Sequence, residues 1–149
     1  MNKTLQILVA CVVFGSGCMG HRYGRLAPVD PKEGGFVSHT SVKSLRPTLV
    51  WKDKEARPET RYDIAVWNFR AAGYATATQW LHGEQLYLRE NIPGTSHTLE
   101  ESLAPDSLFV WSIREHGTTN WAVSLTQANM GPYGTSQKTH YFVFRTLAR

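Results

Sequence analysis

Six histidines, two cysteines and one pair of neighbouring glutamates are the residues of this chain that could carry catalytic or metal chemistry. Metal sites that a sequence can reveal combine His, Cys and carboxylate ligands at short spacings such as HxxxH or HExxH. The histidines show neither of these spacings: they are His21, His39, His82, His97, His116 and His140. We therefore expect no metal site and no cofactor.

The glutamate pair is Glu100 and Glu101, and two carboxylates can divide the roles of acid and base when their environments differ. Neighbours on a strand point to opposite faces, so these two are not expected to share one site. The chain has no GxSxG nucleophile motif, and residues 131–134 (GPYG) lack the spacing of a phosphate-binding loop. The sequence predicts a protein that is not an enzyme.

Binding is the chemistry that the sequence leaves open. Trp80 and Tyr74 lie in a stretch of ambiguous structure, and Met130 and Tyr133 lie in a Gly-rich connection near the C-terminus. Aromatic side chains on loops stack on sugar rings or anchor protein partners. The alternative, that Trp80 and Tyr74 cover the edge of the fold, is favoured over binding.

The first residues have the order of an export signal. Lys3 gives a short positive start, residues 7–14 (ILVACVVF) form an apolar run, and residues 15–17 (GSG) are small. This order is typical of a secretory signal peptide, and the run is too short for a membrane-spanning helix, which needs about 18 apolar residues.

The stretch FGSGCMG resembles the lipobox of bacterial lipoproteins. The resemblance implies cleavage before Cys18 and lipid on both its sulfur and its amino group. Two or more acyl chains hold a protein firmly at a membrane, so the resemblance also implies a stable anchor. The stretch LVAC, which ends at Cys11, matches the lipobox letters better but leaves a very short apolar region, so Cys18 is preferred. Met19, in place of the aspartate that retains such proteins at the inner membrane, implies the outer membrane.

Cleavage before Cys18 would remove Lys3 and Cys11 and leave a chain with one cysteine and a small positive excess. No intramolecular disulfide could then form, so the domain must depend on its hydrophobic core. The basic residues are spread along the chain without a cluster, which does not favour nucleic-acid binding.

The organisation that follows is a signal peptide at 1–17, a lipidated flexible tether at 18–40 and one domain at 41–149. Residues 18–40 are rich in Gly, Pro and charge and have no periodicity. The rest of the chain alternates short strand-like runs with turn signals, which predicts an antiparallel β-sandwich. About seven strands are expected: 48–51, 62–67, 85–89, 96–100, 107–114, 120–126 and 139–146. Residues 71–81 could form one short helix or an irregular strand.

Alternation within these runs predicts which side chains point inward. Phe109, Trp111 and Ile113 share one face of their strand, while Ser112 and Arg114 fall on the other. Further inward residues are expected at Leu49, Trp51, Tyr62, Ile64 and Val66. Large aromatic side chains dominate the energetics of such cores, so loss of either tryptophan should unfold the domain.

Residues 41–149 resemble a fibronectin type III-like domain of bacterial surface and periplasmic proteins. The segments that carry the resemblance are SLRPTLVW, RYDIAVW, LYLREN, HTLEESLAPDSLFVWSIRE, NW and HYFVFRT. Leu103, Pro105, Phe109, Trp111 and Ile113 match the family's turn and penultimate strand. Phe109 stands where the family has a tyrosine whose hydroxyl ties this corner to the backbone.

These observations together predict a membrane-anchored, non-enzymatic lipoprotein of the cell envelope that acts as an interaction or scaffolding module for another envelope protein. A carbohydrate- or peptidoglycan-binding module that uses Trp80, Tyr74 or Tyr133 is the alternative. A soluble periplasmic or secreted form is the alternative to the anchored one.

Overall fold

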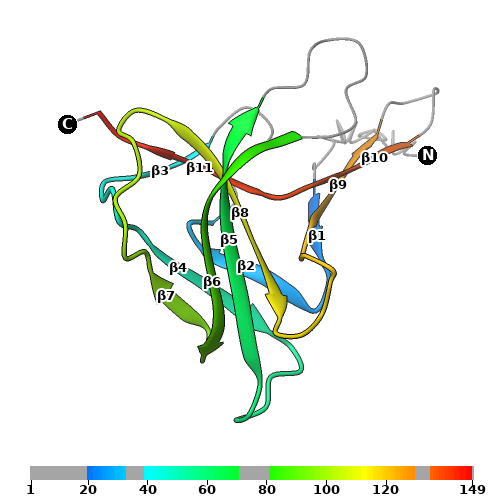
Figure 1. Ribbon diagram of the computed structural model, residues 1–149. Coiled ribbons are helices and arrows are strands. Elements are labelled where there is room, and N and C mark those ends of the chain that lie inside the picture. The colour runs from blue at the N-terminus through cyan, green and yellow to red at the C-terminus, as the bar shows by residue number, and fades with distance from the viewer. Residues whose placement is uncertain (1–19, 33–38, 71–80, 130–134, 149) are drawn as a thin grey trace, which may run out of the picture.

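The protein is all-β throughout residues 20–32, 39–70, 81–129 and 135–148, which are the residues that the computed structural model describes (Figure 1). The described strands are β1 (Gly20–Tyr23), β2 (Leu26–Asp30), β3 (Thr40–Val42), β4 (Thr48–Asp53), β5 (Arg61–Arg70), β6 (Leu81–Pro93), β7 (Ser96–Thr98), β8 (Leu108–Glu115), β9 (Ser124–Asn129), β10 (Thr135–His140) and β11 (Phe142–Thr146). The predicted fold class, all-β, is therefore confirmed. Of the segment 71–81, predicted to be a short helix or an irregular strand, residues 71–80 lie outside the described residues and Leu81 begins β6.

The strands form three hydrogen-bonded sheets, in the orders β3-β11-β8-β5-β6, β2-β4-β7 and β1-β9-β10. The first two sheets face one another across the core, with β4 crossing behind β5 and β6 in Figure 1. All described pairings are antiparallel except that of β3 with β11, which is parallel. The prediction of a purely antiparallel sandwich is wrong at this edge.

The core between the two sheets contains the side chains that alternation selects. Leu49 and Trp51 of β4 pack against Tyr62, Ile64 and Val66 of β5. Phe109, Trp111 and Ile113 of β8 join them, with Phe142 and Phe144 of β11. Leu103 is also buried, whereas Pro105 is exposed because it lies in the turn before β8.

The opposite face of the large sheet is buried as well. Ala65, Trp67, Val110 and Val143 form a second apolar cluster there, against which the partly buried Trp121 and Tyr141 pack. Ser112, on the same face of β8, is fully buried and its hydroxyl donates to the carbonyl of Ala122 at 2.5 Å. Period-two alternation predicts two faces of a strand but does not tell whether the second is covered.

The segment predicted to be a flexible tether contains two strands. β1 pairs with β9, and β2 pairs with β4, where Ala27 is buried at the contact. β3 then crosses the predicted domain boundary at residue 40. Gly and Pro made this segment look like a linker, but Pro is tolerated in an edge strand, and β2 is at the edge of its sheet.

The predicted last strand, 139–146, is two strands in different sheets. β10 ends at His140 and pairs with β9, whereas β11 begins at Phe142 and pairs with β8. The strand count is therefore higher than the predicted seven, because the chain changes sheet at Tyr141 and adds strands before residue 41.

Thr146 ties the corner before β8 to the last strand. Its hydroxyl donates to the carbonyl of Ala104 at 2.7 Å and accepts from the amide of Ser107 at 3.1 Å, and the side chain is fully buried. A threonine on β11 thus ties a corner at which Phe109 has no hydroxyl to offer.

Candidate functional site

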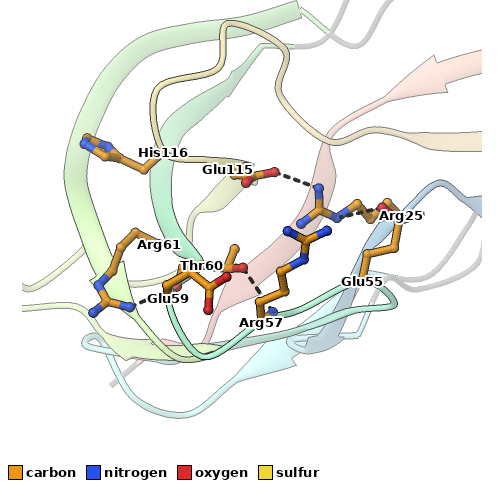
Figure 2. A pocket seen from close by; sticks show the side chains of 8 residues that line it. All are labelled: Arg25, Glu55, Arg57, Glu59, Thr60, Arg61, Glu115 and His116. Atoms are coloured by element: carbon orange, nitrogen blue, oxygen red, sulfur yellow. Dashed lines mark hydrogen bonds and ion pairs between the residues drawn. The ribbon is translucent and has the colours of Figure 1, made fainter.

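The candidate site is a pocket of about 430 Å³ at one end of the fold (Figure 2). Three segments that are far apart in the sequence form it: the β1–β2 turn, the β4–β5 connection and the end of β8. The residues that line it are Arg25, Glu55, Arg57, Glu59, Thr60, Arg61, Glu115 and His116. In Figure 1 this end, with the β4–β5 connection at the bottom, is opposite the start of β1.

Arg25 forms one wall of the pocket and is held by two carboxylates. Its Nε and Nη2 donate to the two oxygens of Asp53, each at 2.7 Å, and Nη1 donates to Glu115 at 2.6 Å. The Asp53 side chain is fully buried. Parallel donation to both carboxylate oxygens is the strongest geometry of an arginine–carboxylate pair, so this wall is fixed.

Tyr62 completes the environment of Asp53. Its hydroxyl donates to Asp53 at 2.9 Å, and its ring lies edge-on to Trp51 at 5.5 Å between centroids. Hydrogen bonds from Arg25 lower the pKa of Asp53 below its usual value against the opposing effect of burial. Burial and the bond to Asp53 raise the pKa of Tyr62 to about 12. The carboxylate therefore stays ionised and the phenol neutral at neutral pH.

A second buried carboxylate lies at the start of β5. Oδ1 of Asp63 accepts from the amide of Asn91 at 3.1 Å and lies 2.7 Å from Nδ1 of His116, and Oδ2 accepts from Nε of Arg114 at 2.9 Å. Burial alone would raise the pKa of Asp63, but the hydrogen bonds from Asn91, His116 and Arg114 outweigh it and the net shift is downward. Asp63 therefore positions His116 at the rim of the pocket.

The β4–β5 connection is closed by two hydrogen bonds. The amide of Thr60 donates to the carbonyl of Arg57 at 3.0 Å, and the amide of Arg57 donates to Oγ1 of Thr60 at 3.0 Å. Pro58 takes the second position of this four-residue turn, where its fixed φ is favoured. Arg57 and Glu59 therefore project from a rigid turn.

The chemistry that these residues can perform is polar recognition. The lining consists of arginines, glutamates, one threonine and one histidine, and the Thr60 hydroxyl is engaged within its own turn. Among the described residues, no group of three or more His, Cys, Asp or Glu side chains is placed to hold a metal ion.

The sequence-predicted contact residues Tyr74, Trp80, Met130 and Tyr133 lie outside the described residues, as does Cys18. Glu100 and Glu101 are both exposed, and Glu100 faces Arg89 at 3.7 Å. His97 is partly buried and its Nε2 lies 2.7 Å from the Tyr87 hydroxyl; burial lowers the pKa of His97.

Sequence reasoning missed the pocket. The run KDKEARPET reads as a charged turn, and residues 18–40 read as a tether, so nothing local joins Arg25 to Asp53. One signal was present: Asp63 interrupts the apolar run YDIAV on a strand, where an ionised side chain requires a partner.

Comparisons with protein-family models, with curated proteins and with solved structures gave no match to this chain. No helix long and apolar enough to cross a membrane occurs in the described ranges.

Proposed function

We propose that this protein is a membrane-anchored, non-enzymatic lipoprotein of the bacterial cell envelope that binds another envelope protein through its β-domain. The observation that carries the proposal is the order of the chain: a lipobox-like stretch ends at Cys18, and β1 begins at Gly20. Lipid on Cys18 would fix the protein to the bilayer, and Met19 favours the outer membrane as its location.

A fibronectin type III-like sandwich is the finer fold assignment that we propose. Two facing sheets with an aromatic core and a tied corner before β8 support it. The parallel β3–β11 pair and the third sheet, β1-β9-β10, are departures from an all-antiparallel arrangement of two sheets. The fold would serve as a scaffold that presents contact residues at its ends.

The short distance in sequence between Cys18 and β1 determines how close the anchored domain would lie to the bilayer. Only Met19 separates the lipid-bearing residue from the first strand, so the domain would lie close to the bilayer. The pocket lies beyond the end of β1 rather than at its start, because Arg25 of the β1–β2 turn lines it. Anchoring raises the local concentration of such a site for partners in the same compartment.

The experiment that tests the anchor is the intact mass of the protein isolated from membranes, compared with Cys18→Ser. We expect a mass that corresponds to cleavage before Cys18 with added acyl chains, and release of Cys18→Ser from the membrane. Cys11→Ser is the matched control: cleavage before Cys18 removes Cys11, so the mass of the mature protein should be unchanged. An unlipidated mature protein would refute the anchor.

The interaction is tested separately by crosslinking in intact cells. The expected result is one recurrent crosslinked envelope protein that depends on the folded domain. Crosslinks that persist unchanged when the domain is unfolded by Trp111→Ala would refute a specific interaction.

A further inference from the structure

We propose that the pocket binds a peptide group that carries a free carboxylate and a free ammonium group close together, with Arg57 binding the carboxylate and Glu59 the ammonium. This inference rests on the interaction role proposed above and names its site and chemistry. It does not depend on the lipid at Cys18.

Arg57 has no acidic partner within the described part of the chain. Arg25, Arg114 and Arg145 each have a carboxylate within 2.6–2.9 Å, whereas no described carboxylate lies within 4.0 Å of the Arg57 guanidinium. Figure 2 shows the Arg57 side chain extending from the β4–β5 connection toward Arg25. An arginine in this position presents its donors to the pocket.

The turn from Arg57 to Thr60 keeps opposite charges apart. Arg57 and Glu59 are two residues apart, and the two hydrogen bonds of the Arg57–Thr60 turn fix the backbone between them. No ion pair joins them in the described structure, and the buried Thr60 limits rearrangement of the turn. A ligand with a complementary pair of charges would not have to break an existing ion pair of either residue.

The pocket walls carry charges of both signs. Three arginines and three glutamates line the pocket, and Arg25 is already paired with Asp53, with Glu115 and, at 3.7 Å, with Glu55. Arg57, Arg61 and Glu59 remain outside these pairs, so a simple anion would leave Glu59 without a partner and a simple cation would leave Arg57 without one. A group that carries both charges meets a partner for each, which is how electrostatic complementarity selects a ligand.

Free dipeptides test this chemistry with matched blocked forms. The full chain carrying Cys18→Ser, labelled with ¹⁵N, is titrated with alanylalanine, with N-acetyl-alanylalanine, which keeps the carboxylate, and with alanylalanine amide, which keeps the ammonium. We expect alanylalanine to shift the amide signals of residues 57, 59–61 and 116 with a Kd of about 1 mM. Each blocked form should bind at least about fivefold more weakly, and inorganic phosphate should bind no better than N-acetyl-alanylalanine.

Arg57→Gln and Glu59→Gln are the variants, and Arg89→Gln and Glu84→Gln, at exposed positions of β6, are their matched controls. Each pocket variant should weaken dipeptide binding about tenfold, which corresponds to about 1.4 kcal/mol, while the controls bind as the parent does. Equal binding of the free and blocked dipeptides would overturn the inference, and so would full binding by Arg57→Gln. Absence of shifts at about 20 mM dipeptide would also overturn it. A partner that still crosslinks in that case would leave the proposed function standing.

Discussion

Arg25 and Asp53 form a two-point ion pair that joins the β1–β2 turn to the end of β4, across 28 residues of sequence. The aspartate side chain is fully buried, and the arginine side chain keeps 32% of its surface exposed. Through Glu115, the same arginine also reaches the end of β8. One side chain thus connects the N-terminal strands to both facing sheets.

Replacing Arg25 by alanine is expected to lower the free energy of unfolding by about 2–3 kcal/mol, because it leaves a buried carboxylate without its partner. Urea unfolding measures the change. Arg89→Ala is the control, since the pair of Arg89 with Glu100 is exposed and 3.7 Å long, and its loss should cost less than about 1 kcal/mol. Equal effects of the two substitutions would show that Asp53 does not depend on Arg25.

The Arg25–Asp53 pair also shows where prediction from the sequence ends. Alternation in YDIAV and LFVWSI is local, so it identifies the core side chains of β5 and β8 without any knowledge of the fold. The role of residues 20–30 depends on which strand lies beside them, and composition alone made them look like a linker. The pocket is missed for the same reason, because its walls come from three separate segments.

Acid is expected to weaken the fold through Asp53 and Asp63. Both have folded-state pKa values below their usual value, so as pH falls the unfolded chain binds protons first and the free energy of unfolding decreases. The contribution is fully present above the unfolded pKa of about 3.9 and is lost as pH falls through the folded values. Urea unfolding between about pH 6 and about pH 2.5 measures this slope.

Asp63→Asn should reduce the slope of the free energy of unfolding against pH in acid, because the side-chain amide does not titrate there. It should also lower the free energy of unfolding at neutral pH, because a neutral amide cannot form an ion pair with Arg114. Asp106→Asn is the control, since that carboxylate is exposed in its pair with Arg145, and it should leave the slope close to that of the parent. An unchanged slope in Asp63→Asn would contradict the assignment.

Thr146→Val is expected to lower the free energy of unfolding by about 1–2 kcal/mol, because the carbonyl of Ala104 and the amide of Ser107 lose a buried hydroxyl partner. Valine has nearly the same shape, so packing is kept and the change reports the hydrogen bonds. Thr48→Val removes an exposed hydroxyl that pairs with Thr98 and should cost little. Thermal unfolding compares the two, and a harmless Thr146→Val would mean that the corner is held by packing alone.

Removal of the N-terminal strands distinguishes a folded element from a tether. A chain that lacks residues 20–30 would lose the edge strand beside β4, expose Trp51 and Leu49 at their sheet edge, and leave Asp53 without Arg25. We expect it to unfold at a clearly lower urea concentration than the full chain, or not to fold.

Replacing residues 20–30 by a Gly/Ser sequence of equal length is the matched control, because it keeps the length but supplies neither Ala27 nor Arg25. It should be as unstable as the deletion. If both variants unfold at the urea concentration of the parent, residues 20–30 contribute nothing to the fold and act as a linker.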